Sequence, residues 1–435
     1  MTTAALKPRR SWVDYLIIFL VIGYLTMGRR FAYIGYAPVF IGEIGLGSIL
    51  VARYRALLGT WITALSQRSP ISLVAWMIFA GAMYGCVSAL RGVAAGYDPI
   101  VILKLLVLHT YPLFFFVGAW LGVRRPDLLP NLIRWLAWAV GLYGIIYVFV
   151  LQPANLGAVS ASAEVPIAGQ PYGPAVALLG LLCFEPRLAS VWLLLVLNTI
   201  TLLGLQVRAS WLGFAAALSI WTVIQGRFMR LLALGAVIAG LLLVGVVTDL
   251  RVPSPGRRGG EFSARNIAAQ ALAPLAPGLA SRLTNTDKEV YAGTFEFRLM
   301  FWGALWDNVH ESSSTTLFGP GYGYPIWELG PHMPRGAPEL RSPHNVFMYC
   351  LAYTGWVGVG MFYALQLAIL AVLWRVYRGA GQAFGFCYVV MINVWALFDP
   401  LIASPMGAIP YYSLVGLAAA PALLAPHRDS SSQRS

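Results

Sequence analysis

Long runs without a charged residue constrain the fold of this chain more than any other feature. Seven of them approach or exceed the length of a membrane-spanning helix, which needs about 20 residues; they cover residues 71–90, 135–151, 188–207, 209–226, 231–248, 345–374 and 379–398. Composition agrees, because 59% of the 435 residues are hydrophobic and only 11% are charged, whereas a soluble domain has about 25% charged residues. The sequence therefore predicts an all-α integral membrane protein.

Shorter or more polar segments are further candidates for spans; they cover residues 15–27, 31–52, 101–123, 166–184 and 409–424. With these five, the chain has about twelve predicted transmembrane helices. The expected organisation is a membrane bundle of about nine spans in residues 1–248, an external loop in residues 249–342, about three spans in residues 343–426 and a tail in residues 427–435. The first apolar run follows basic residues without a small-residue cleavage site, so we expect a permanent span there.

The distribution of positive charge predicts which side of the membrane each loop faces, because Lys and Arg accumulate in cytoplasmic loops. With the N-terminus inside, the short cytoplasmic segments hold sixteen Lys and Arg residues and the short external segments hold four. Both termini are therefore expected in the cytoplasm. Most of the net charge of +13 then faces anionic lipid headgroups, so it does not require a nucleic-acid partner.

The external loop carries signs of folded structure. Residues 249–341 hold nine of the seventeen acidic residues of the chain. Apolar side chains at positions 295, 299, 302, 306 and 309 alternate in steps of four and three, which predicts an amphipathic helix. A glycine-rich turn, LFGPGYGYP, follows at residues 317–325. We expect this loop to be partly folded and to lie over the membrane surface.

The segment where the loop re-enters the membrane is the strongest candidate for chemistry. Ser342 fits the N-cap of the next helix, Pro343 its first position and His344 its first turn. A helix N-terminus disfavours a charged imidazole and favours anions. A neutral His344 could therefore act as a base beside a bound phosphate; the alternative is that it only helps to cap the helix at the membrane interface.

Two arginines are candidates for binding phosphate. Arg208 lies in a tight external turn between two apolar runs, where its planar guanidinium could contact two phosphate oxygens. The alternative is that Arg208 reaches lipid headgroups. Arg298 lies in the predicted amphipathic helix, where it is either a site residue or a solvated or paired surface residue.

Ionisable residues within predicted spans suggest a rival function. Glu43, Lys104 and His109 lie at membrane depth, where such groups are costly. We expect Lys104 and Glu43 to neutralise each other, whereas a transporter would use such groups for proton coupling. The sequence has no nucleotide-binding loop and no clustered carboxylate pair, and its four cysteines lack ligand spacing, so no metal or other cofactor is expected.

Three segments, in this order, resemble the O-antigen ligase and O-antigen polymerase superfamily of bacterial membrane glycosyltransferases. They are QVRASWLGFAAAL at residues 206–218, residues 297–324 with an Arg-x₃-Trp helix before the glycine-rich turn, and SPHNVFMYCLAYTGWVGVG at residues 342–360. Twelve predicted spans with a large loop before the His-Asn pair are also similar to that family. The chain differs at QPY (170–172), where many relatives have an Asn-containing turn, and at YTG (353–355), where an acidic residue commonly precedes the glycine.

The resemblance implies a GT-C-like membrane glycosyltransferase. Its donor would be a glycan linked to undecaprenyl pyrophosphate, and its acceptor a lipid or another glycan on the external face of the bacterial inner membrane. The reaction would be metal-independent and inverting. The catalytic residues implied are Arg208, Arg298 and His344, and the substrate-binding residues are Arg341, Asn345, Gln170 and Tyr172.

The acceptor distinguishes two activities within this superfamily. A ligase is slightly preferred, and a surface-polysaccharide polymerase is the close alternative. A polytopic transporter or lipid-linked sugar flippase is the alternative from another class.

Overall fold

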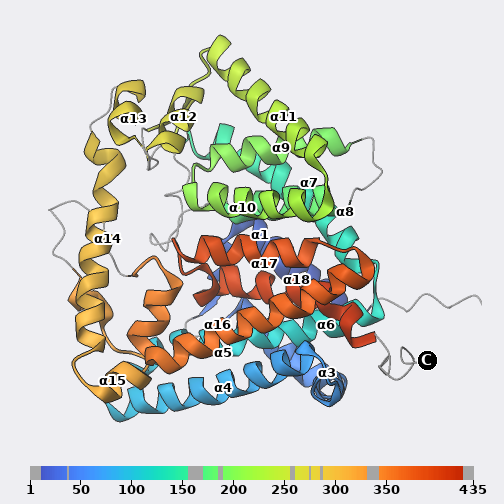
Figure 1. The fold of residues 1–435 in the computed structure, drawn as a ribbon, viewed down its shortest axis with the longest axis vertical. Coiled ribbons are helices and arrows are strands. Elements are labelled where there is room, and N and C mark those ends of the chain that lie inside the picture. The colour runs from blue at the N-terminus through green and yellow to red at the C-terminus, as the bar shows by residue number, and fades with distance from the viewer. Residues whose placement is uncertain are drawn as a thin grey trace, which may run out of the picture.

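The computed structural model describes residues 11–36, 39–154, 170–184, 190–254, 260–273, 276–284, 288–330 and 342–424, with the backbone alone for residue 277 and residues 288–296. These residues form an almost entirely helical structure (Figure 1). The strands among them are two antiparallel pairs, in which Gly35 lies opposite Phe40 and Val252 lies opposite Phe262.

The elements before the large loop are α1 (Trp12–Met27), α2 (Arg29–Ala32), β1 (Gly35–Tyr36), β2 (Val39–Phe40), α3 (Ile41–Ser66), α4 (Pro70–Ala94), α5 (Pro99–Thr110), η1 (Tyr111–Leu113), α6 (Phe114–Arg124), α7 (Leu128–Ile146), η2 (Tyr147–Leu151), α8 (Tyr172–Phe184), α9 (Val191–Gly204), α10 (Arg208–Gln225) and α11 (Phe228–Val247). The loop contains β3 (Val252–Pro253), β4 (Glu261–Phe262), α12 (Ala264–Leu272), α13 (Pro277–Thr284), α14 (Lys288–Val309), α15 (Ser313–Phe318) and η4 (Ile326–Leu329). The last elements are α16 (Val346–Ala380), α17 (Phe384–Ala396), η5 (Leu401–Ala403) and α18 (Pro405–Leu424).

A helix overlaps each of the twelve predicted spans. Six helical stretches in the described part of the chain are long and apolar enough to cross a membrane: α4, residues 99–124, residues 128–151, α11, α16 and α18. Shorter apolar helices, α1, α8, α9 and α17, accompany them. The chain is therefore an all-helical membrane protein. In Figure 1 helices such as α4, α10, α16 and α17 run across the picture, and α14 stands upright beside their left-hand ends.

Glycines let the most deeply buried of the long apolar helices, α18, pack closely against α6. A Cβ added at Gly118 of α6 would lie 2.2 Å from the carbonyl oxygen of Ser413 in α18, and one added at Gly416 would lie 2.1 Å from that of Phe115. Only glycine fits at such a distance, so the two backbones come into contact. Small residues serve this purpose at helix interfaces in membranes, where close van der Waals packing stabilises association.

The second predicted span differs from the structure in its boundaries. The prediction placed it at residues 31–52, whereas α3 begins at Ile41 after the β1–β2 hairpin and continues to Ser66, with non-helical backbone angles at Arg53. Residues 53–66, which the prediction left outside the span, therefore belong to a helix. The error has a simple cause, because arginines indicate where a chain leaves the hydrocarbon and not where its helix ends. Figure 1 shows part of α3 along its own axis, at an angle to α4.

The predicted pairing of Glu43 with Lys104 is wrong. Glu43 lies in the first turn of α3, where its carboxylate accepts a hydrogen bond from the backbone N–H of Phe40 at 3.0 Å and another from the hydroxyl of Tyr111. Lys104 is exposed on α5, and no ion pair joins these two described residues. The acid caps a helix start, a role that its position before an apolar run allows.

The glycine-rich turn of the loop enters the bundle instead of lying over it. Tyr322 is fully buried, and its hydroxyl lies 2.5 Å from Nδ1 of His109 on α5. Its backbone N–H donates to the carbonyl of Ser88 on α4 at 3.1 Å, and a Cβ at Gly92 would lie 1.9 Å from its carbonyl oxygen. The prediction of a surface loop is thus wrong for this turn, because its glycines let the backbone reach α4.

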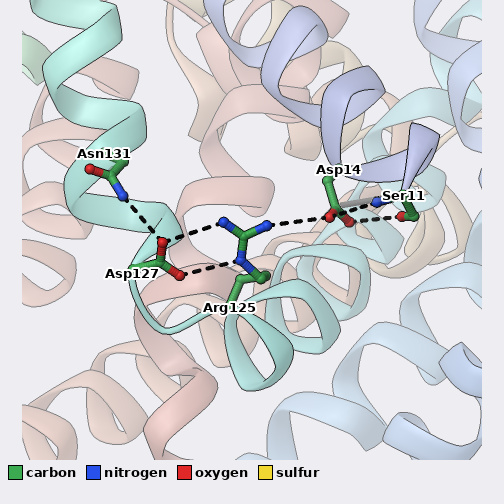
Figure 2. A network of polar contacts seen from close by, with 5 residues as sticks. All are labelled: Ser11, Asp14, Arg125, Asp127 and Asn131. Atoms are coloured by element: carbon green, nitrogen blue, oxygen red, sulfur yellow. Dashed lines mark hydrogen bonds and ion pairs between the residues drawn. The ribbon is translucent and has the colours of Figure 1, made fainter. Parts of the chain in front are cut away.

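A polar network joins the start of α1 to the turn between α6 and α7 (Figure 2). The buried carboxylate of Asp14 accepts hydrogen bonds from Ser11 and lies 3.7 Å from the guanidinium of Arg125. Arg125 also donates to both carboxylate oxygens of Asp127 at 3.3 Å, and Asn131 donates to the same carboxylate. Opposite charges therefore fix two chain segments that are more than a hundred residues apart.

Replacing Arg125 should destabilise the protein. Arg125→Ala leaves the buried Asp14 carboxylate without its cation, and we expect the free energy of unfolding to fall by about 1–3 kcal/mol. Thermal unfolding of the detergent-solubilised protein measures this. The control is Arg378→Ala, an exposed arginine at the end of α16, which should change stability by no more than about 0.5 kcal/mol. Equal losses in the two variants would contradict the role given to the network.

Candidate functional site

The helix that re-enters the membrane begins three residues later than predicted. Asn345 and not Ser342 is the N-cap of α16, and its side-chain oxygen accepts a hydrogen bond from the N–H of Met348 at 3.1 Å. His344 has a φ of +50°, in the left-handed region. A helix cannot pass through that conformation, so His344 lies just outside the first turn and projects from a fixed bend.

Hydrogen bonds to backbone carbonyls hold this bend from two sides. The indole N–H of Trp302 on α14 donates to the carbonyl of Pro343 at 2.6 Å. The side-chain amide of Asn345 donates to the carbonyl of Leu397, just after α17, at 3.0 Å. The residues flanking His344 are thus attached to the external loop and to the end of α17. The substrate contact predicted for Asn345 stays a prediction, since its side chain already has two partners in the protein.

Arg298 reaches the same place from α14. Its guanidinium donates to the carbonyl of Phe398 at 3.4 Å. Arg298 and Trp302 are four residues apart, so both point from one face of the helix toward the residues around His344 and the end of α17. Asp399 directly follows Phe398, and the charge of Arg298 acts on its carboxylate. We call the group formed by Arg298, His344 and Asp399 the rim cluster.

The helix predicted in this loop is confirmed, although its buried stripe differs from the prediction. α14 spans Lys288–Val309, but Phe301, Leu305 and Val309 form its buried face. Leu299 and Trp306, which were expected on the apolar face, are 48% and 42% exposed. The structure describes only the backbone of residue 295, so its predicted place on the apolar face stays a prediction.

Electrostatic effects within the rim cluster alter two pKa values. Burial and, as the smaller cause, the positive charge of Arg298 together lower the pKa of His344 to about 4. Burial raises the pKa of Asp399 to about 6, against the opposing effect of the Arg298 charge. At neutral pH the imidazole is therefore uncharged, while Asp399 is mostly ionised and gains a proton as the pH falls through about 6.

Sequence reasoning missed Asp399. It follows α17 at the edge of a predicted span, and it is the one acidic residue between positions 342 and 426. That isolation was the available signal, because a carboxylate in so apolar a region is costly without a partner. Only the fold brings it near Arg298, which is 101 residues away.

Arg208 lies at the same end of the bundle. α10 and α17 lie side by side (Figure 1), and a Cβ at Gly213 of α10 would lie 2.7 Å from the carbonyl of Met391 in α17. Gln225, at the other end of α10, donates to the carbonyl of Gly381, so the helices are antiparallel. Arg208, the first residue of α10, therefore lies level with the last residues of α17, which the rim cluster contacts.

Gln170 and Tyr172 lie at the start of α8, inside the bundle. Tyr172 is fully buried, and its hydroxyl hydrogen-bonds to that of Tyr388 at 2.8 Å. Gln170 is 6% exposed, and its N–H donates to the carbonyl of Thr26. These contacts give both residues a packing role, and their contact with substrate stays a prediction. Arg341 lies outside the described residues.

The described residues include no group of three or more His, Cys, Asp or Glu side chains that could hold a metal ion. Compared with models of known protein families and with curated proteins, the chain shows no match. The chemistry of the rim cluster and Arg208 must therefore carry the functional argument.

The pKa values of the rim cluster are open to measurement. We expect the His344 imidazole to titrate near pH 4, and Arg298→Gln to raise its pKa, because removing a nearby positive charge makes protonation less costly. The shift should be partial, since burial remains. NMR of the histidine-labelled protein follows this, with His344→Gln to assign the signal among five histidines and Arg251→Gln, at an exposed arginine, as the control. A wild-type value near 6.5 would contradict the assignment.

Proposed function

We propose that this protein is a membrane glycosyltransferase that moves a glycan from a polyprenyl pyrophosphate, such as undecaprenyl pyrophosphate, to an acceptor hydroxyl. In this proposal it has a GT-C-like architecture with twelve spans, both termini in the cytoplasm, and a reaction on the external face of a bacterial inner membrane. The observation that supports it best is the meeting of Arg298, His344 and Asp399 at the end of the bundle that also carries Arg208. The three resembling segments each contribute to that end.

The charges suit a lipid-linked diphosphate. Arg298 and Arg208 supply two guanidinium groups, and each can form paired hydrogen bonds with phosphate oxygens. Arg208 is the first residue of α10, where the free N–H groups and the helix dipole also favour an anion. Apolar helices beside this end would hold the polyprenyl tail in the bilayer.

The transfer itself needs a base and a stabilised leaving group. The acceptor oxygen forms a bond to the anomeric carbon while the bond from that carbon to the pyrophosphate oxygen breaks, and its electron pair leaves with the diphosphate. The two arginines stabilise the charge that develops there, a contribution that is often the largest in catalysis. The acceptor proton passes to His344, whose imidazole is neutral at working pH. Displacement from the opposite side inverts the anomeric configuration.

The acceptor decides between two activities. A ligase would transfer the finished chain to a lipid-anchored glycan, and a polymerase would extend another lipid-linked repeat. We favour the ligase slightly, and product length in a reconstituted reaction separates the two.

Transport is the weaker proposal. It would need a polar cavity around Glu43 and Lys104, yet Glu43 caps α3 and Lys104 is exposed. A cavity of about 20 Å³ does lie beside His109, but its lining is mostly apolar and it has room for about one water molecule.

Removing any one of three side chains should stop transfer. We expect Arg208→Ala, Arg298→Ala and His344→Ala each to lower turnover by at least about 10²-fold, the usual effect of losing one transition-state group. Arg208→Lys should also be poor because the paired hydrogen bonds are lost. The measurement is reconstitution with a polyprenyl-pyrophosphate oligosaccharide and candidate acceptors, with release of the pyrophosphate lipid as readout.

The matched control is Arg251→Ala, which removes an exposed arginine that pairs with Asp249. It should retain wild-type turnover, and all variants should reach wild-type abundance in the membrane. Full turnover of purified Arg208→Ala and His344→Ala would overturn the proposed roles.

The acid limb of the pH profile should belong to Asp399. Its carboxylate attracts and orients the Arg298 guanidinium, so transfer should fall as the pH drops through about 6 and Asp399 gains a proton. His344 protonates only near pH 4. In Asp399→Asn, turnover at neutral pH should be lower, and it should fall further only as the pH drops to about 4. A limb near pH 6 that persists in Asp399→Asn would rule out this assignment.

A further inference from the structure

A buried cluster of three amide side chains attaches the large loop to the turn that carries Arg208. Gln206, between α9 and α10, donates from its amide to the backbone carbonyl of Glu261 at 2.9 Å. Its amide oxygen accepts from Gln270 of α12 at 2.7 Å and from Asn266 at 3.4 Å. Gln206 is 8% exposed, and Asn266 and Gln270 are each 1% exposed. Hydrogen bonds among buried amides are costly to lose, because a group left without a partner stays desolvated.

The backbone at Gln206 has an unusual conformation. Its φ of +52° lies in the left-handed region, which residues with a side chain seldom adopt. This bend lets the chain turn within three residues from the end of α9 at Gly204 to the start of α10 at Arg208. The direction in which the Arg208 side chain projects from α10 therefore depends on a strained residue that the amide cluster holds in place.

We infer that Gln206 is a positioning residue, which acts through Arg208 by fixing the α9–α10 turn to α12 of the loop. This inference rests on the proposed function, since it concerns the arginine that would stabilise the charge developing on the leaving diphosphate. A guanidinium displaced by about 1 Å loses much of its effect on a transition state. Loss of Gln206 should therefore lower kcat while the KM for the donor changes little, because the affected charge develops as the bond breaks.

Gln206→Gly is the sharpest test. Glycine adopts the left-handed conformation without strain, so this variant removes the amide contacts but keeps a favourable backbone. We expect kcat to fall about 10- to 100-fold at unchanged membrane abundance. The matched control is Asp249→Gly, because Asp249 also has a positive φ, of +46°. Asp249 is exposed, and its side chain pairs with Arg251. It should keep the wild-type kcat.

A second variant guards against a fold defect in the first. Gln270→Met keeps the volume of the side chain in α12 but removes its donor to Gln206, and we expect a smaller fall in kcat. In an Arg208→Lys background, Gln206→Gly should lower kcat by less than about threefold, because there is no guanidinium left to orient. Gln206→Gly with wild-type kcat, or with an undiminished loss in the Arg208→Lys background, would overturn the inference.

Arg208→Ala run in parallel separates the two possible failures. If the wild-type protein shows no transfer, the proposed function fails, and the role of Gln206 fails with it. If Arg208→Ala keeps full turnover, the role of Arg208 fails, and so does positioning through it. If Arg208→Ala is inactive while Gln206→Gly and Gln270→Met have the wild-type kcat, only the positioning role is wrong.

Discussion

The absence of water in the hydrocarbon layer is the constraint on which the rest of this structure depends. Every backbone polar group within the layer needs a partner inside the protein, so the chain crosses as helices and its irregular segments gather at helix ends. α6 and α18 satisfy this condition through their own helical hydrogen bonds, and their glycines let the two backbones come into contact. Because desolvation of a charge is costly, charged side chains are then stable only at the ends of the bundle or beside a partner. The site follows from this, because His344 and Asp399 lie where helices begin or end, and Arg298 reaches the end of α17 from α14.

Hydrogen bonds to backbone carbonyls hold the residues of that site in place. Trp302, Asn345 and Arg298 each donate to a carbonyl, of Pro343, Leu397 and Phe398 respectively. The last residues of a helix leave carbonyls without partners in the helix, and here side chains from distant segments use those after α17. One consequence is electrostatic: the cluster is buried enough to keep His344 neutral and to raise the pKa of Asp399.

The large loop is part of the bundle in two places. Tyr322 reaches His109 between α4 and α5, and Gln270 reaches Gln206 at the α9–α10 turn. α14 lies between these attachments in the sequence and carries Arg298. A loop fixed only at its two ends could not hold a guanidinium at a constant distance from His344. The attachments explain why so long a connection contains so many helices.

The sequence by itself determined the membrane class, the approximate place of twelve helices and the helix that carries Arg298, because apolar runs and their periodicity are local properties of the chain. It also pointed to Arg208, Arg298 and His344 through motif order. It misplaced the end of α3, the partner of Glu43, the cap of α16 and the buried face of α14, since each depends on which segment packs nearby. Only the tertiary structure decided that Asp399 joins Arg298 and His344, and that Gln206 is held by α12, because those contacts join residues 55 to 101 positions apart that no local pattern relates.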